Sequence, residues 1–311
     1  MIKPRALRPG DRVALVAPAS PFSREAFDAG VAELRRRGYD PVYDDSVFAR
    51  TRYTAGDPPL RAEAFRRAWA DPSIAALMAV RGGYGSVQIL PLLEVGDIRR
   101  TPKAFIGYSD NTSLLNWLTG RCGIVSFHGP MIDGRLEKGE AGYDLDSFTR
   151  VLTRVEPAGT ITHPQVVALR DGDSAGVLLG GTLTQLTASL GTPYAFDPPR
   201  GHILFIDEVA ERPYRIDRMM TQLALSGLLA KASGIVFGEL PRCDEPRDNG
   251  QTGPLIKEVL VDLLAGFRGP VLFGLPSGHT NGPTLTLPFG VRVRVVTRPQ
   301  PALVVEESAV S

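Results

Sequence analysis

Short apolar runs alternate with amphipathic stretches along most of the chain. Runs such as DRVALVA (residues 11–17) and IAALMAV (residues 74–80) end in proline, arginine or glycine, which is typical of buried strands. The stretch REAFDAGVAELRRRG (residues 24–38) instead places its apolar residues three or four positions apart and ends at a glycine, which predicts a helix. Because such strands and helices alternate, the pattern predicts a parallel sheet with helices on both faces.

The same pattern predicts the remaining elements. Further strands are predicted at residues 40–45, 103–109, 123–129, 201–209, 232–240 and 269–276, further helices at 60–70, 86–93, 112–118, 214–230 and 253–267, and a strand, Gly-Gly turn and helix at 174–191. The stretch PTLTLPFGVRVRVVT (residues 283–297) alternates at period two, which predicts a hairpin-like pair of half-buried antiparallel strands.

The pattern weakens between about residues 133 and 172, where the composition turns polar and only one helix, at 144–154, is predicted. We therefore divide the chain into an N-terminal domain (1–135), a connecting segment (136–172) and a C-terminal domain (173–311). The fold class predicted is α/β with two domains, the second with a mixed sheet because its last strands are antiparallel.

Composition excludes several classes of protein. The 35 basic and 34 acidic residues nearly cancel, so no overall field favours a nucleic acid or a membrane as partner. Two cysteines are too few for a disulfide framework or a zinc site and fit a reducing compartment. No apolar run reaches the roughly 18 residues of a membrane span, and the first residues do not resemble a signal peptide. We expect a soluble cytoplasmic protein.

Candidate chemistry gathers at the ends of the predicted strands. In open α/β sheets, ligands bind beyond the carboxyl ends of the strands. That rule selects residues 18–20, 81–85, 107–111, 127–131, 207–211 and 278–280.

Ser109 stands where a predicted strand becomes a helix, in the segment Gly107-Tyr108-Ser109-Asp110-Asn111. A serine on such a turn is typical of a nucleophile elbow, whose usual signature is G-x-S-x-G. The final glycine is replaced here by asparagine, which tolerates left-handed backbone better than most residues. The alternative is that Ser109 or Asp110 only caps the helix that follows.

A serine hydroxyl needs a base to become a nucleophile, and histidine is the commonest one. Of the four histidines, His163 and His202 lie where exposed, inert side chains are expected. His279 follows an apolar strand in a glycine-rich loop, and Gly278 precedes it. His128 also follows a strand end, so spacing alone leaves both His279 and His128 as candidates.

The base in turn needs a carboxylate that orients the imidazole. Asp207 and Glu208 directly follow an apolar run, and Glu211 comes shortly after. Successive strand residues point to opposite faces, so at most one of Asp207 and Glu208 is expected to face the site. The alternative for these acids is to cap the next helix or to pair with the arginines that follow.

An acyl-transfer site also needs hydrogen-bond donors for the developing oxyanion. The turn RGGYG (residues 81–85) presents bare backbone N–H groups after a strand, with Gly83 at its centre. The N–H of Asp110, next to the candidate nucleophile, would be the second donor. Such a turn could instead hold a phosphate, but neither the dinucleotide fingerprint nor a P-loop lysine is present.

Six segments together resemble the LD-carboxypeptidase family of serine peptidases, which includes muramoyltetrapeptide carboxypeptidases and microcin C immunity hydrolases. They occur in the family's order and cover most of the chain: VRGGYGS (80–86), FIGYSDNTSLL (105–115), FHGPM (127–131), GVLLGGTLTQLTASLGTPY (176–194), ILFIDEVAERPYRIDRMMTQL (203–223) and GLPSGHTNGPTLTLPFG (274–290).

The resemblance implies a catalytic triad of serine, glutamate and histidine. Ser109 matches the nucleophile and His279 the base, while alignment on RPYRIDR places the family's glutamate at Asp207. The aspartate is one methylene shorter, so its carboxylate reaches about 1.5 Å less. A shift of one residue would make Glu208 the acid instead.

The resemblance also implies the architecture and the reaction. A flavodoxin-like N-terminal domain would carry the serine, and a smaller C-terminal domain the acid and the histidine, commonly in a homodimer without metal or organic cofactor. The reaction implied is hydrolysis of the amide between an L-centre of a diamino acid and terminal D-alanine in murein tetrapeptides, with Arg81 as a candidate for holding the free carboxylate. The alternatives are a microcin C-type peptidyl-nucleotide substrate and a non-catalytic binding module.

Overall fold

The strands of the N-terminal half pair in parallel, as the apolar runs predict. The computed structural model describes residues 1–244 and 253–311. The first sheet has the order β12-β5-β4-β3-β1-β2, and β1 to β5 are parallel neighbours. Its strands are β1 (Arg12–Val16), β2 (Asp40–Val42), β3 (Ile74–Ala79), β4 (Ala104–Gly107), β5 (Ser126–His128) and β12 (Leu287–Phe289). The run β2-β1-β3-β4-β5 is the flavodoxin-like order, whose switch point lies between β1 and β3.

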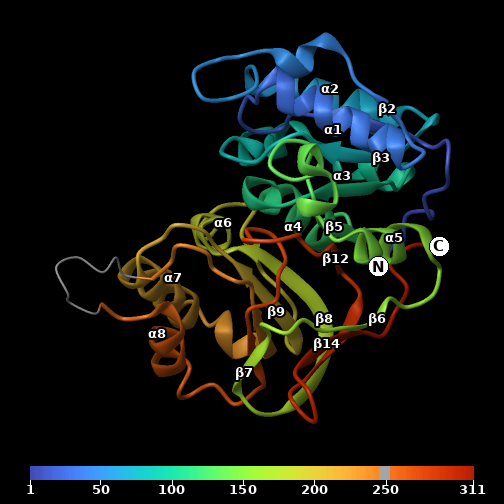
Figure 1. The fold of residues 1–311 in the computed structure, drawn as a ribbon. Coiled ribbons are helices and arrows are strands. Elements are labelled where there is room, and N and C mark those ends of the chain that lie inside the picture. Colours follow the sequence, from blue (N-terminus) through green and yellow to red (C-terminus); the bar gives the residue numbers. More distant parts are fainter. Residues whose placement is uncertain (245–252) are drawn as a thin grey trace.

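Helices connect these strands and cover the sheet in the upper lobe of Figure 1. They are α1 (Arg24–Arg36), α2 (Pro58–Ala70), α3 (Val95–Arg100) and α4 (Thr112–Gly120), with short 3₁₀ segments η1 (Asp45–Phe48), η2 (Ser86–Leu92) and η3 (Ser109–Asn111) between them. Side chains that accept from backbone N–H groups start α1 at Ser23 and α2 at Asp57. The helix predicted at 86–93 is the 3₁₀ segment η2, which contains Pro91, because proline cannot donate to an α-helical ladder.

The C-terminal half forms a mixed sheet of eight strands, seen in the lower lobe of Figure 1. Its order is β6-β14-β13-β8-β9-β10-β11-β7; β8 to β11 are parallel and the flanking strands are antiparallel. Its strands are β6 (Gly159–Ile161), β7 (Val167–Arg170), β8 (Asp173–Thr182), β9 (His202–Asp207), β10 (Ala232–Phe237), β11 (Val271–Phe273), β13 (Arg292–Val296) and β14 (Ala302–Val305). The helices of this lobe are α6 (Leu183–Ala188), α7 (Pro213–Leu225) and α8 (Ile256–Leu263), with the 3₁₀ segment η5 (Leu229–Lys231). The α/β fold with two lobes is therefore confirmed.

Two further segments differ from the sequence prediction. The segment 136–172 holds the expected helix, α5 (Leu145–Thr153), after the 3₁₀ segment η4 (Leu136–Ala141), but it also supplies the edge strands β6 and β7. The final stretch is antiparallel, but it does not form one hairpin: β12 joins β5 of the first sheet, and β13 pairs with β8 and β14 of the second. The hydrophobic pattern of a short edge strand is weak, and it does not show which distant segment the strand pairs with.

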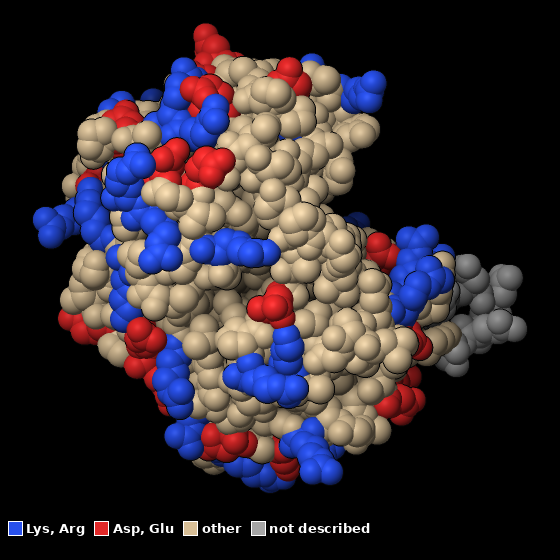
Figure 2. Space-filling view, turned by 180° about the vertical axis from the view of Figure 1, so that it is seen from behind, with Lys and Arg blue, Asp and Glu red and all other residues tan. Residues whose placement is uncertain are grey.

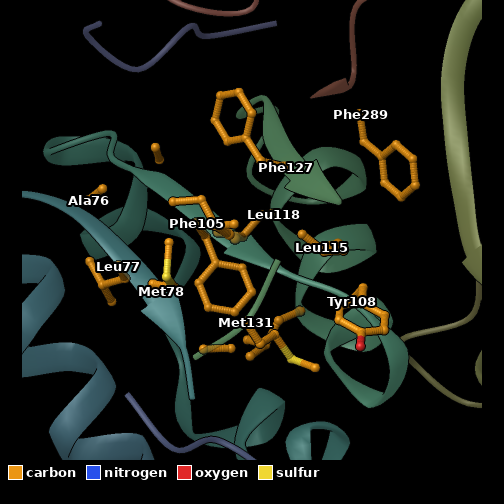
Figure 3. Packing of buried hydrophobic residues seen from close by; sticks show 14 of the residues in the cluster. Ala76, Leu77, Met78, Phe105, Tyr108, Leu115, Leu118, Phe127, Met131 and Phe289 are labelled. Atoms are coloured by element: carbon orange, nitrogen blue, oxygen red, sulfur yellow. The ribbon is translucent and has the colours of Figure 1, made fainter. Parts of the chain in front are cut away.

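One apolar core connects the two lobes. Figure 3 shows Met78 and Phe105 of the first sheet packed near Leu115 and Leu118 of α4, with Phe289 of β12 at one side. All five side chains are essentially inaccessible to solvent. The same cluster continues into residues of β9, β10 and β13, and a second cluster lies under α6, α7 and α8. The chain therefore cannot bury its first core without its C-terminal half.

Within residues 1–244 and 253–311, no helix combines the length and the apolar character needed to cross a bilayer.

The shared core gives a stability prediction. We expect Phe289→Ala to lower the free energy of unfolding by about 3–5 kcal/mol, because it leaves a large cavity in a core that cannot collapse freely. Urea denaturation measures the change, and Val261→Ala, at an exposed position of α8, is the control, expected within about 0.5 kcal/mol of the parent. A loss for Phe289→Ala no larger than that of the control would mean that β12 is not part of the core.

Candidate active site

Ser109 lies on a strained turn at the carboxyl end of β4. Its φ is +62°, in the left-handed region that residues other than glycine rarely adopt. The turn is tight, since a Cβ on Gly107 would lie 3.2 Å from the Cβ atoms of Ala79 and Asn111. Neither η3 nor α4 receives a side-chain cap at its start, so Ser109 does not serve as a helix cap. This backbone geometry is typical of a nucleophile elbow, and the serine is partly exposed.

Asp110 joins this turn to the glycine-rich turn that follows β3. Its carboxylate accepts hydrogen bonds from the Ser86 N–H at 2.8 Å and from Gln185 Nε2 at 3.2 Å, and its carbonyl accepts from Ser86 Oγ at 2.6 Å. Burial raises the pKa of Asp110, against the opposing hydrogen bonds from Ser86 and Gly85. The side chain of Asp110 therefore binds backbone of the neighbouring loop and does not cap the helix.

The glycine-rich turn packs directly against Ser109. A Cβ on Gly82 would lie 2.8 Å from Ser109 Cβ, and one on Gly83, whose φ is +95°, would lie 2.3 Å from Ser20 Oγ. Both positions therefore require glycine. The side chain of Arg81 forms an ion pair with Asp133 at 3.2 Å and is about half exposed.

His279 is hydrogen-bonded to Asp207, which closes the end of β9. His279 Nδ1 lies 2.7 Å from Asp207 Oδ2, and the backbone N–H of His279 donates to Oδ1 at 3.0 Å. Asp207 is fully buried, whereas the His279 side chain is 18% exposed. Burial lowers the pKa of His279, but the charge and hydrogen bond of Asp207 outweigh it, so the pKa lies above its ordinary value. The Nδ1 bond leaves Nε2 of a neutral His279 as the acceptor.

The loop of His279 passes very close to the Asp207 carboxylate. Gly278 has φ +82°, and a Cβ there would lie 2.4 Å from Asp207 Oδ2 and 2.8 Å from His128 Cε1. Only glycine allows this approach. Thr182 adds a long contact from Oγ1 to Asp207 Oδ2 at 3.5 Å.

The two other candidate acids bind elsewhere. Glu208 accepts from the Thr184 N–H at 2.9 Å and from Thr184 Oγ1 at 2.7 Å, at the start of α6. Burial raises the pKa of Glu208. Glu211 forms an ion pair with Arg215 at 3.2 Å. Of the three, only Asp207 contacts His279, as the alternation of strand faces allows.

His128 lies behind the site and is completely buried. Its Nδ1 is 3.1 Å from Ser277 Oγ, which itself donates to the Leu285 carbonyl, so His128 carries its proton on Nδ1. Its Nε2 is buried without a hydrogen-bond partner among the described residues. Burial lowers the pKa of His128 to about 4. The ring of Tyr108 lies 5.9 Å from that of His128 and 5.1 Å from that of His279, so His128 shapes the site from inside.

Arg135 is a buried residue of the site that sequence reasoning did not find. Its Nη2 donates to the carbonyl of Gly278 at 2.7 Å and its Nη1 to that of Gly282 at 3.1 Å, on either side of His279. Its Nε lies 3.3 Å from Tyr108 Oη. Arg135 therefore joins the loop of His279 to the residue before Ser109. Its position in the polar stretch DGRLEKGE gives no local signal of this role.

The surface around the two lobes carries mixed charge. Figure 2 shows Lys and Arg interspersed with Asp and Glu along one side, while much of the surface between the lobes is uncharged. Among the residues that the structure describes, no group of three or more His, Cys, Asp or Glu side chains is arranged to hold a metal ion.

Comparisons with known proteins identify the family of this chain. A family model described as the LD-carboxypeptidase N-terminal domain matches residues 13–129, and one described as the LD-carboxypeptidase C-terminal domain matches residues 175–295. The murein tetrapeptide carboxypeptidase of Pseudomonas aeruginosa is 32% identical over an alignment that covers 86% of this chain and 88% of that protein. The chain belongs to the LD-carboxypeptidase family.

Two further relatives of this LD-carboxypeptidase family member are named for two different functions. The muramoyltetrapeptide carboxypeptidase from Oxalobacter formigenes has a solved structure with a TM-score of 0.83 and 29% identity, covering 96% of this chain and 100% of that one. The microcin C7 self-immunity protein MccF of Escherichia coli is 29% identical over 90% of this chain and 88% of that protein. The structure of MccF with aspartyl sulfamoyl adenosine has a TM-score of 0.89 and 26% identity, with both chains fully covered.

The buried His128 predicts a pH-dependent stability. Its folded pKa of about 4 lies below the ordinary 6.5, so on acidification the unfolded chain takes up this proton first. We expect the His128 contribution to stability to be complete above about pH 6.5 and to fall by roughly 3 kcal/mol as the pH approaches 4. Urea denaturation at a series of pH values measures it, with His128→Asn as the variant that lacks this titration. Parallel pH profiles for the two proteins would contradict the prediction.

Proposed function

We propose that this protein is a serine-type LD-carboxypeptidase that removes the terminal D-alanine from murein tetrapeptides. The observation that carries the proposal is the His279–Asp207 hydrogen bond, placed beside the elbow that presents Ser109. The ring of Tyr108, the residue before the serine, packs at 5.1 Å from the ring of His279. Carboxypeptidase names among the relatives support the reaction class. We place the enzyme in the cytoplasm, in cell-wall recycling, as a homodimer.

The proposed reaction proceeds through an acyl-enzyme. His279 Nε2 takes the proton of Ser109 Oγ as that oxygen attacks the carbonyl carbon of the scissile amide. Collapse of the tetrahedral intermediate breaks the C–N bond, and the imidazolium gives its proton to the departing amine of D-alanine. His279 then takes a proton from water as the water attacks the ester carbon. The ester C–O bond breaks, the imidazolium returns the proton to Ser109 Oγ, and the shortened peptide leaves as the carboxylic acid. Asp207 holds the imidazole by its Nδ1–H and stabilises its cationic form.

The backbone N–H groups of Gly83 and Asp110 are the proposed oxyanion donors. The contact between Gly82 and Ser109, together with the hydrogen bonds of Asp110 to the neighbouring turn, supports this assignment. Donors fixed before the reaction stabilise the developing charge without reorganisation. For the free carboxylate of D-alanine, Arg81 is the candidate cation, and the substrate would then compete with Asp133 for it.

A peptidyl-nucleotide of the microcin type is the second candidate substrate. The relationship to MccF favours it, and so does an exposed aromatic pair, Tyr53 and Tyr84, whose rings lie 5.7 Å apart. Trp69 and Trp117 are buried, so neither is available to stack on a nucleobase. The murein peptide therefore remains the first choice.

Release of D-alanine tests the proposal directly. We expect the protein to convert anhydro-muramyl tetrapeptide to tripeptide, and mass spectrometry measures this conversion. We expect Ser109→Ala to lower kcat by at least about 10⁴-fold, because it removes the nucleophile. Circular dichroism shows whether the variant remains folded. Cleavage of a peptidyl-nucleotide in place of the tetrapeptide would select the second substrate, and cleavage of neither would leave a binding module.

The raised pKa of His279 predicts the acid limb of the pH profile. The base must be neutral, so kcat/KM is expected to fall as the pH drops through a pKa above the ordinary 6.5. Asp207→Asn removes the charge that raises this pKa. We expect the activity of this variant to be lower by about 10⁴-fold, and the acid limb of its kcat/KM profile to lie at lower pH than in the parent. The measurement is kcat/KM from pH 5 to 9 for both proteins. An unmoved limb would mean that Asp207 does not act on the base.

A further inference from the structure

Arg61 is a buried cation beneath the glycine-rich turn. It belongs to α2 and is only 3% exposed. We propose that Arg61 is a positioning residue that fixes the oxyanion-donating turn against Ser109, an inference that rests on the proposed function. Arg61 acts through backbone groups and does not itself touch the reacting atoms.

The guanidinium binds three separate segments at once. Its Nε donates to the Gly56 carbonyl at 3.1 Å, and its Nη1 donates to the carbonyls of Pro18 and Gly85, the latter at 2.7 Å. Its Nη2 donates to Gln88 Oε1 at 2.5 Å. These partners lie after β1, before α2 and after β3. Because β1 and β3 flank the switch point of the sheet, Arg61 ties together the loops that border the site.

The segment of Gly85 and Ser86 is held from both sides. Arg61 binds the carbonyl of Gly85, and the N–H of Ser86 is hydrogen-bonded to the Asp110 carboxylate. A Cβ on Gly85 would lie 2.8 Å from Arg61 Nη1, so glycine is required for the contact. The turn is therefore clamped between a buried cation and a buried anion, and Asp110 supplies one of the two proposed donor N–H groups.

Burial of the Arg61 guanidinium costs free energy, because the charge loses its hydration even when hydrogen bonds are made. The contacts that it makes must therefore offset this cost. Burial lowers the pKa of Arg61, against the charge of Asp110. The planar guanidinium of arginine donates hydrogen bonds in fixed directions and can bind several backbone carbonyls at once. The ammonium group of lysine lacks this fixed geometry. Gly82 and Gly83 carry no side chain to pack, so hydrogen bonding must position this turn.

Lys103 offers a matched control. It is also buried, at 6% exposed, and its Nζ donates to the carbonyls of Asp71 and Ile74. It precedes β4, at the opposite end of that strand from Ser109. A variant such as Lys103→Met removes a buried cation and its carbonyl contacts without touching the glycine-rich turn.

The test compares Arg61→Ala, Arg61→Lys and Lys103→Met, with kcat and KM for D-alanine release and thermal melting. We expect Arg61→Ala to lose about 10²-fold in kcat with KM within about threefold, as for loss of an oxyanion donor. Free guanidinium, below denaturing concentrations, should restore part of that kcat, whereas Arg61→Lys should remain impaired. Lys103→Met should lose melting temperature but keep kcat within about threefold of the parent, because it leaves the turn in place.

Hydrogen–deuterium exchange separates this inference from the proposed function. Amides of residues 80–90 and 105–112 should exchange faster in Arg61→Ala and remain as in the parent in Lys103→Met. Unchanged exchange in Arg61→Ala, or a parental kcat for the folded variant, would overturn the positioning role. A parent that releases no D-alanine would refute the proposed function, and exchange would still decide whether Arg61 fixes the turn.

Discussion

The site depends on one stretch of backbone, residues 274–286, because its two ends belong to different sheets. β11 precedes it in the eight-stranded sheet, and β12 follows it in the six-stranded sheet. Between them, Asp207 binds both the main chain and the imidazole of His279, and Arg135 binds carbonyls on either side. The position of His279 relative to Ser109 is therefore set by the same strand, β12, that completes the first core. The pairing of β12 with the first sheet therefore both completes the core and assembles the site.

Buried charged side chains hold the loops of the site in place, whereas apolar side chains pack the rest of the molecule. The loops at the strand ends are rich in glycine, so they have little surface to pack. Asp110 and Asp207 bind N–H groups of a neighbouring loop, while Arg61 and Arg135 bind carbonyls. A hydrogen bond to a charged group is stronger than a neutral one, and a buried partner left alone is costly. The loops consequently have one favourable arrangement, in spite of the strain at Ser109.

The places of the candidate residues at strand ends were predictable, because these residues directly follow apolar runs. Ser109, Asp207 and the glycine-rich turn are adjacent to strands whose buried character is visible in the sequence. The geometry separates His279 from His128 by burial and hydrogen bonding, which spacing could not do. Arg135 and the placement of β12 were not predictable, because contacts over more than a hundred residues leave no local pattern. The same limit hid strands β6 and β7, which are short and form the two edges of the second sheet.

Asp207 and the loop of His279 fit closely together. Its carboxylate uses both oxygens on the loop of His279, one for the backbone N–H and one for the ring. Gly278 passes so near that any side chain there would meet Oδ2. A glutamate would carry its carboxylate about 1.5 Å further, into that backbone, unless the loop moved away. The length of the side chain at position 207 and the approach of the loop are therefore coupled, and Gly278 is the residue that allows both carboxylate oxygens of Asp207 to bind this loop.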